Sequence, residues 1–189
     1  MVKEPHAGRV KTRLARDVGV VRATWWYRHN VMRVLQRLES PRWSLVLAVS
    51  PDVEGLTSRI WPSHIPRIPQ GRGDLGERMR SIFDTLAPAP TCIIGSDIPD
   101  VNHSHIRACF ATLGSNDAVV GPAPDGGYWL IGLHNARATN RTFMRDVRWS
   151  TSHALSDTIA SLPDASWAYG PALRDVDTRR DLDAIHGTT

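Results

Sequence analysis

Lysine is rare in this chain, and both lysines lie in one short segment at its start. Lys3 and Lys11 are the two lysines among the 23 lysine and arginine residues of the chain. Gly8 and Arg13 lie in the same segment, residues 3–14. An ammonium is a compact point charge on a flexible stem, which suits a phosphate group. A solvated basic turn leading into a helix is the ordinary alternative. The segment is therefore a candidate anion site.

A second candidate is the carboxylate of Asp97, which follows a predicted buried strand at residues 92–95. Ligands in open α/β sheets collect beyond the carboxyl ends of the strands. An aspartate at that place can hold a divalent cation that bridges phosphate oxygens. Asp97 or Asp100 could instead cap the next helix, but Asn102 and Ser104 are also able to do so. We favour the metal site for Asp97.

Two further carboxylates lie near the end of the chain. Asp175 and Asp177 are two residues apart, so they point the same way if the backbone is extended. They could complete the metal site begun by Asp97, because such ions usually need more than one carboxylate or a substrate phosphate. Capping of the last helix by Asp177 or Thr178 is the alternative, and the two roles are compatible.

A glycine-rich segment, residues 70–79, leads into a predicted helix. Asp74 followed three residues later by Glu77 resembles a capping box, which explains both carboxylates as helix-initiating residues. The capping box leaves the glycines unexplained. A glycine-rich loop that leads into a helix N-terminus also suits a nucleotide or a phosphate.

A second glycine motif, Asp125-Gly126-Gly127-Tyr128, lies between two predicted strands. Asp-Gly and Gly-Gly between strands are common hairpin turns. Glycines also allow a ligand to approach the backbone closely. The spacing alone leaves both interpretations open.

The elements that would position these residues alternate along the chain. Strands alternating with helices predict an α/β fold with a mostly parallel sheet and helices on both faces. We see no repeat or linker, so we expect one domain over residues 1–189. The predicted strands are 44–49, 92–95, 118–121 and 128–133, and the predicted helices are 20–39, 75–87, 103–113 and 151–162.

Composition excludes several classes of protein. Hydrophobic residues make up 41% and charged residues 22%, which is ordinary for a globular domain. No apolar run is long enough to span a bilayer, and no signal peptide is recognisable, so we expect a cytoplasmic location and no membrane partner. Cys92 and Cys109 are interpreted as small buried thiols.

Positive charge is concentrated at the start of the chain. Residues 1–42 hold ten basic and three acidic residues, a net charge of about +7. Nucleic acid is one partner that such a field could attract. However, no nucleic-acid motif is present and the aromatic residues are not interleaved with the basic ones, so we expect a small phosphorylated ligand.

Together and in this order, the motifs resemble a family of small bacterial glycosyltransferase-like proteins. Some of its members are called arsenosugar-biosynthesis glycosyltransferases or radical-SAM-associated transferases, and relatives include the phospholactate and molybdenum-cofactor guanylyltransferases. The resemblance spans the chain. Its segments are residues 3–14, 70–79 (Q-G-x-G-D-L-G-E-R-M), 94–99 (I-G-S-D-x-P), 125–133 (D-G-G-Y-x-L-I-G-L), 149–151 and 175–182 (D-V-D-T-x-x-D-L).

This resemblance implies a glycosyltransferase-A-type, Rossmann-like sheet of the nucleotide-diphospho-sugar transferase fold. It implies a nucleotide-activated donor, a small-molecule acceptor, and Mg²⁺ or Mn²⁺ bound by Asp97 with help from Asp175 or Asp177. Asp97, Asp125 and Lys11 would be the catalytic residues, with Asp125 as general base. The substrate contacts would be Lys3, Gly8, Lys11, Arg13, Gly73, Asp74, Gly76, Arg78, Gly126, Gly127 and Tyr128.

One departure from the family concerns the first strand. The family has a full apolar strand before its lysine, whereas Met1 and Val2 alone precede Lys3 here. In the expected sheet order, this strand lies in the middle, between the strands at residues 44–49 and 92–96. We therefore expect a truncated first strand and a natural start roughly five to eight residues upstream, about one strand length.

These inferences predict a metal-dependent transferase, with glycosyl transfer as the leading hypothesis. Nucleotidyl transfer to a phosphorylated acceptor, which releases pyrophosphate, is the close alternative. A non-catalytic nucleotide-binding module is a third hypothesis, because a fold does not fix a function. The base, the sugar, the acceptor and the oligomeric state stay open, with a homodimer as one candidate.

Overall fold

A computed structural model describes residues 1–135 and 142–186 of the chain. These residues form seven helices and seven strands, which confirms the predicted α/β class. They divide into two compact units, and the expectation of a single domain stays a prediction. The first unit comprises Met1–Pro69, Ser96–Asn102 and the described residues from Arg174 onward, and the second comprises Gln70–Gly95 and the described residues between His103 and Leu173.

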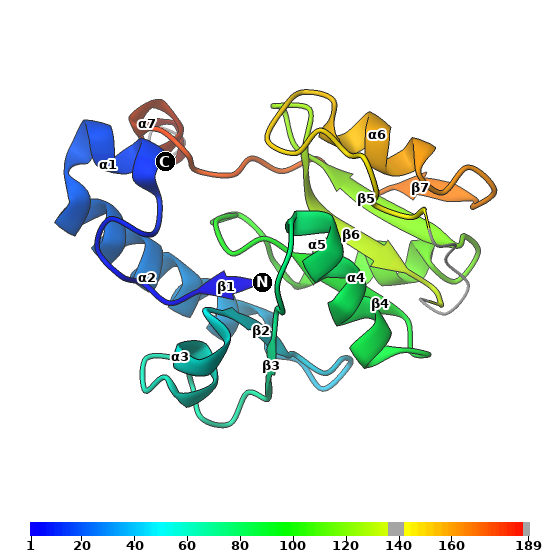
Figure 1. The fold of residues 1–189 in the computed structure, drawn as a ribbon, viewed down its shortest axis with the longest axis horizontal. Coiled ribbons are helices and arrows are strands. Elements are labelled where there is room, and N and C mark those ends of the chain that lie inside the picture. Colours follow the sequence, from blue (N-terminus) through cyan, green and yellow to red (C-terminus); the bar gives the residue numbers. More distant parts are fainter. Residues whose placement is uncertain (136–141, 187–189) are drawn as a thin grey trace. The chain divides into compact units, whose positions relative to one another are not determined.

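The first unit contains a three-stranded parallel sheet (Figure 1). Its strands are β1 (Val2–Lys3), β2 (Leu47–Ser50) and β3 (Arg67–Pro69), in the order β1-β2-β3. The predicted pairing of the first strand with the strand at 44–49 is confirmed, because Val2 pairs with Val49. The predicted central position is wrong: β1 is an edge strand of its sheet, and the strand at 91–94 belongs to the other sheet. β1 has two residues in this chain.

Four helices belong to the first unit: α1 (Thr12–Val18), α2 (Val20–Leu38), α3 (Asp52–Thr57) and α7 (Arg179–His186). The predicted helix at 20–39 is confirmed as α2. Its apolar residues at i, i+3, i+4 and i+7 form the buried face, as the pattern requires. Val31, Val34, Leu35 and Leu38 are each at most 5% exposed.

The second unit contains a mixed four-stranded sheet. Its strands are β4 (Thr91–Ile94), β5 (Ala118–Pro122), β6 (Tyr128–Leu133) and β7 (Trp167–Tyr169), in the order β4-β6-β5-β7. β6 is antiparallel to both β4 and β5, whereas β7 is parallel to β5. Three of the five strand pairs in the described chain are thus parallel. The Asp125–Tyr128 segment is the turn that connects β5 to β6 in a hairpin.

The helices of the second unit are α4 (Leu75–Leu86), α5 (His103–Thr112) and α6 (Ala154–Ala160). The first two agree with the helices predicted at 75–87 and 103–113. α6 begins three residues after its predicted start, and His153 is its N-cap residue. The reason is local: Ser150 has a left-handed φ of 60° and the Thr151 hydroxyl closes a turn onto the carbonyl of Arg148.

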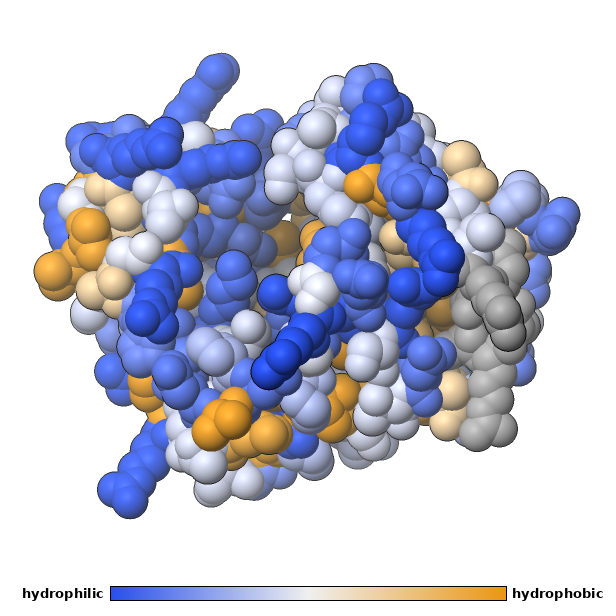
Figure 2. All heavy atoms as spheres, in the orientation of Figure 1, coloured by the Kyte–Doolittle hydropathy of each residue, from blue (hydrophilic) through white to orange (hydrophobic). Residues whose placement is uncertain are grey.

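The face of the molecule drawn in Figure 2 carries mainly polar side chains. In Figure 2 the hydrophobic residues on the visible face form small separate groups among hydrophilic ones. The most exposed large hydrophobic residues are Val21, Trp25, Val53 and Tyr169. None of the helices in the described part of the chain has the length and hydropathy that a membrane span requires.

Candidate functional site

Three carboxylates that are distant in sequence meet in the first unit. Asp97, Asp175 and Asp177 each offer one oxygen, and these oxygens all lie within 4.8 Å of one another. All three residues are partly exposed. Hard carboxylate oxygens are the ligands that Mg²⁺ and Mn²⁺ prefer, so this donor set fits the cation that the sequence predicts. We call these three residues the acidic cluster.

Helix α2 holds the segment that carries Asp97. The side-chain amide of Asn30 donates to the carbonyl of Ser96 over 3.1 Å, and the hydroxyls of Tyr27 and Ser96 lie 3.1 Å apart. The backbone of Asp97 is fixed from the other side, because its carbonyl accepts from the N–H of Val176 over 3.1 Å. The carboxylate is thereby presented on a backbone that is bonded on both sides.

The other two carboxylates are positioned by the start of α7. The N–H and hydroxyl of Thr178 both donate to Asp181 Oδ2, over 2.8 and 2.7 Å, and the N–H of Asp177 donates to the same oxygen. Thr178 and Asp181 therefore cap α7. Burial alone would raise the pKa of Asp181, but hydrogen bonds, chiefly from Thr178, outweigh it and lower that pKa. Asp177 is left to use its carboxylate elsewhere.

Lys11 places its ammonium against this cluster. Its Nζ donates to Asp177 Oδ1 over 2.7 Å and also to Asp97 Oδ2. Its side chain is only 6% exposed. Burial alone would lower the pKa of Lys11, but the two carboxylates outweigh it and raise that pKa. The ammonium is therefore charged at neutral pH.

The backbone explains why Lys11 reaches this position. It precedes α1 in a left-handed conformation, with φ 46° and ψ 48°, which is uncommon for a residue with a side chain. Val10 and Leu14, on either side of it, are buried at 4% and 0% exposure and fix the segment in the core. The strained residue is thus held by its packed neighbours.

The remaining basic candidates lie at different places. Arg13 donates to Asp177 Oδ2 over 3.1 Å and is mostly exposed. Lys3 exposes its side chain, while its backbone N–H donates to the Tyr27 hydroxyl over 2.9 Å. Gly8 has a φ of 78° in an exposed turn. The structure thus brings Lys11 and Arg13 to the acidic cluster, and phosphate contacts of these residues stay a prediction.

The first unit also has a pocket of about 690 Å³ with two arginines on its wall. It is lined by Asp100, Arg174, Arg180, Ala184 and Ile185. Arg174 lies 3.4 Å from Asp181, whereas the exposed guanidinium of Arg180 has no ion-pair partner in the described part of the chain. The pocket offers a positively charged wall in the unit that contains the acidic cluster.

In the second unit, the first glycine motif is organised around the start of α4. The predicted capping box is confirmed: Asp74 Oδ1 accepts from the N–H of Glu77 over 2.8 Å, and Glu77 Oε2 accepts from the N–H of Asp74 over 2.9 Å. Gly73 has a φ of 100°, and its carbonyl accepts from Nε of Arg78 over 3.0 Å. Both carboxylates therefore serve the helix start.

Gly76 has a packing role. A Cβ at this position would lie 2.8 Å from the indole of Trp149 and 2.5 Å from the carbonyl oxygen of Met144. Contacts that short are not tolerated, so the close packing needs glycine. Trp149 is therefore a packing residue against the start of α4.

The second glycine motif is a hydrogen-bonded hairpin turn. Asp125 Oδ1 accepts from the N–H of Gly127 over 2.9 Å, and Gly126 has a φ of 86°. The Tyr128 hydroxyl lies 3.2 Å from that of Thr158, and burial raises the pKa of Tyr128. The turn accounts for one oxygen of Asp125; its Oδ2 has no hydrogen-bond partner among the described residues.

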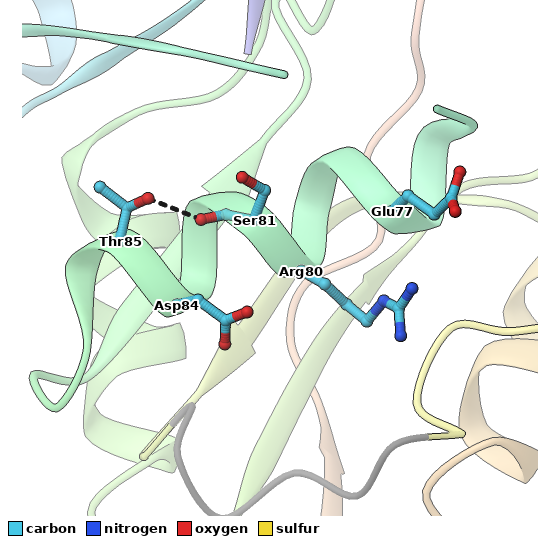
Figure 3. Close-up of a pocket in the computed structure, with 5 residues that line it drawn as sticks. All are labelled: Glu77, Arg80, Ser81, Asp84 and Thr85. Carbon is cyan, nitrogen blue, oxygen red and sulfur yellow. Dashed lines mark hydrogen bonds between the residues drawn. The ribbon is translucent and has the colours of Figure 1, made fainter. Parts of the chain in front are cut away.

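A further groove runs along α4, and all its lining side chains come from that helix. Figure 3 shows them on successive turns, with the Thr85 hydroxyl donating to the carbonyl of Ser81 over 2.7 Å. The groove is lined by Glu77, Arg80, Ser81, Asp84 and Thr85. Because Glu77 already belongs to the capping box, we assign this groove no chemical role.

Three supporting residues were not found from the sequence: Tyr27, Asn30 and Asp181. Tyr27 and Asn30 occupy the buried face of α2, and Asn30 is only 6% exposed. A polar side chain on an apolar helix face is a signal that could have been used, because buried polar groups require partners. Asp181 lies three residues after Thr178, which is the spacing of a capping box.

Comparison with known proteins shows the class to which this fold belongs. A crystal structure from Desulfovibrio desulfuricans G20, described as a "putative nucleotide-diphospho-sugar transferase", is similar at a TM-score of 0.87 and 31% sequence identity. The match covers 99% of this chain and 84% of that one. The chain therefore has the nucleotide-diphospho-sugar transferase fold, as the resemblance implied.

The family follows from a second comparison. The sequence profile described as "Uncharacterized protein conserved in bacteria (DUF2064)" matches residues 33–151. The chain belongs to this family of nucleotide-diphospho-sugar transferase-like proteins. Among curated proteins, no match is found.

Proposed function

We propose that this protein is a divalent-metal-dependent transferase that uses a nucleotide-activated donor, and that it transfers a glycosyl group. The observation that carries the proposal is the acidic cluster with Lys11 and Arg13 beside it. The similarity to a protein described as a sugar transferase supports the same class of reaction.

Asp97, Asp175 and Asp177 would hold Mg²⁺ or Mn²⁺. When bound, such a cation neutralises negative charge that develops on a departing diphosphate. Lys11 and Arg13 supply two further positive charges beside the carboxylates, where they would stabilise the same developing charge. The chemistry assigned to these residues is therefore electrostatic.

The second unit carries further residues to which we assign roles. The carboxylate of Asp125 keeps one oxygen outside the hairpin hydrogen bond, and we assign that oxygen the role of general base. The glycines at 73, 76, 126 and 127, together with Asp74, Arg78 and Tyr128, are the proposed ligand contacts of this unit. Lys3 and Gly8 are the corresponding proposals in the first unit.

Nucleotidyl transfer is the second candidate. It is favoured by the lysine-containing segment at residues 3–14, which resembles that of the guanylyltransferases. In this reaction an acceptor phosphate attacks the α-phosphate of a nucleoside triphosphate, and pyrophosphate leaves.

Product analysis tests the proposal. The purified protein is incubated with Mn²⁺, a panel of nucleotide sugars or nucleoside triphosphates, and sugar, alcohol and phosphate acceptors. Release of a nucleoside diphosphate with a glycosylated product supports glycosyl transfer, and release of pyrophosphate supports nucleotidyl transfer instead. Donor binding without turnover across the whole panel would contradict catalysis and favour a binding module. A screen of thermal stability against the same donors would first select those that bind the folded protein.

A further inference from the structure

We infer that Lys11 is a resident counter-ion of the acidic cluster, so that the site disfavours a free divalent cation and accepts the cation together with a diphosphate. The inference rests on the proposed function, since it takes the acidic cluster as the metal site. It adds that the cation enters the site together with a diphosphate.

Lys11 already occupies part of the proposed metal site. The Lys11 ammonium contacts Asp97 and Asp177, which are two of the three proposed metal ligands. Its side chain is 6% exposed, so it is enclosed with these carboxylates rather than extended into solvent. A divalent cation bound by the same oxygens would lie beside a positive ammonium, and the two would repel each other. Free metal must therefore compete with Lys11.

The formal charges around the acidic cluster favour joint binding of a cation and a diphosphate. The three carboxylates carry a formal charge of −3, and Lys11 with Arg13 returns it to −1. A divalent cation alone would leave the cluster at +1. A diphosphate arriving with the cation supplies the negative charge that compensates both the metal and the ammonium. The pair is therefore better accommodated than either partner alone.

Lys11 combines a fixed backbone with a flexible side chain. The backbone of Lys11 is held in its left-handed conformation between Val10 and Leu14, both of them buried. The lysine stem has four carbons joined by rotatable bonds, so a change of rotamer can move the ammonium from the carboxylates to a neighbouring anion while the backbone stays in place. A displaced ammonium requires a new anionic partner, because burying an unpaired charge is costly. The phosphate of the incoming ligand is that partner.

This exchange makes metal and diphosphate binding cooperative. If the diphosphate relieves the competition from Lys11, it raises the affinity for the metal, and the metal must raise the affinity for the diphosphate by the same factor. Removal of the ammonium should therefore change the two affinities in opposite directions. Free metal should bind more tightly, and the metal–diphosphate complex should bind more weakly.

The test measures Mn²⁺ binding by electron paramagnetic resonance for the wild type, Lys11→Met and Arg16→Met, with and without inorganic pyrophosphate. Arg16→Met removes one positive charge from the exposed side of α1 and serves as the matched control. For Lys11→Met we expect about tenfold tighter binding of free Mn²⁺ and about tenfold weaker binding of the Mn²⁺–pyrophosphate complex. Arg16→Met should change both affinities less than threefold. Unchanged or weaker binding of free Mn²⁺ in Lys11→Met, or an equal gain in Arg16→Met, would overturn the inference.

A second measurement uses the wild-type protein alone, in case Lys11→Met does not fold. Because the chain has two lysines, ¹⁵N-lysine labelling gives two side-chain ammonium signals, from Lys3 and Lys11. We expect the Lys11 signal to shift when Mg²⁺ and pyrophosphate are added together and to stay in place with the same concentration of Mg²⁺ alone. A Lys11 signal that never moves, or that moves fully with Mg²⁺ alone, would refute the exchange.

The failure of this inference is distinguishable from failure of the proposed function. Asp97→Asn should abolish Mn²⁺ binding in either form if the acidic cluster is the metal site. If Asp97→Asn binds Mn²⁺ as the wild type does, the proposed function loses its metal site. If Asp97→Asn fails to bind while Lys11→Met shows no gain, the role of Lys11 alone is rejected.

Discussion

The acidic cluster of the first unit and the glycine motifs of the second use the same residue type for different purposes. Asp97 and Asp177 direct their carboxylates to Lys11. Asp74 and Asp125 direct theirs to backbone N–H groups of their own turns. A carboxylate that accepts from the adjacent backbone is explained by local folding, whereas carboxylates gathered around a cation are not. The carboxylates of the first unit are therefore the stronger candidates for a functional role.

The largest expected effect is the loss of turnover in Asp97→Asn. The amide keeps the shape of the side chain but removes one charged metal ligand, so kcat/KM should fall about 100-fold or more. Unfolding free energy should change by at most about 2 kcal/mol, because Lys11 keeps Asp177 as a partner. Steady-state kinetics and urea denaturation measure the two quantities.

Asp183→Asn is the matched control for that variant. Asp183 is an exposed carboxylate on α7 whose ion-pair contact is a surface pair with Arg179. Its replacement should leave kcat/KM and stability near the wild-type values. Full turnover in Asp97→Asn, or an equal loss in Asp183→Asn, would break the distinction between the acidic cluster and ordinary carboxylates.

The next effect concerns Asp125, whose carboxylate accepts a hydrogen bond within its own turn and is also the proposed general base. Asparagine retains the Oδ1 acceptor for the N–H of Gly127 but cannot take up a proton. If Oδ2 is the general base, Asp125→Asn lowers kcat roughly 100-fold with unchanged stability. Rapid-quench measurement of the chemical step checks this. A kcat equal to that of the wild type would limit Asp125 to its hairpin.

A smaller effect is expected at Asp74. Loss of the N-cap in Asp74→Ala should cost about 1 kcal/mol of stability, whereas Asp74→Asn should cost only a few tenths because asparagine caps as well. Urea denaturation of both variants tests the confirmed capping box. The KM for the donor then separates capping from binding. A raised KM in Asp74→Asn, at unchanged stability, would show that this carboxylate also contacts the ligand.

The smallest effect is a change in the response of stability to acid. Hydrogen bonds from the Arg148 side chain hold the pKa of Asp157 well below its usual 3.8. A carboxyl whose pKa is lowered by folding stabilises the native state above its unfolded pKa, and this contribution is lost as the pH falls through the folded pKa. Asp157→Asn should therefore lose less stability than the wild type between about pH 5 and about pH 2. An equal loss of thermal stability in the wild type and Asp157→Asn over this pH range would contradict a stabilising role for this ion pair.

Much of the fold could be predicted from the sequence, because its signals are local. The apolar periodicity of α2 and the Asp74–Glu77 spacing each specify a structure within a few residues, and both predictions are confirmed. The start of α6 was predicted wrongly, since the left-handed backbone of Ser150 ends the turn in a way that no propensity indicates. Short elements such as α3 and β7 have too few residues for a periodic signal.

The site could be predicted only in part. The grouping of Asp97 with Asp175 and Asp177 was anticipated, and it is present. The position of the Lys11 ammonium was not anticipated. Its partners Asp97 and Asp177 lie 86 and 166 positions away in the sequence, and its position depends on a left-handed backbone. The sequence indicated which residues carry charge, while tertiary structure decided which charges meet.

The most direct test of the account is anomalous diffraction from crystals grown with Mn²⁺ and pyrophosphate. The account predicts one strong Mn²⁺ peak coordinated by Asp97, Asp175 and Asp177, with the Lys11 ammonium moved from the carboxylates to a phosphate oxygen. A Mn²⁺ peak at any other set of residues, with Lys11 still bonded to Asp97 and Asp177, would contradict it.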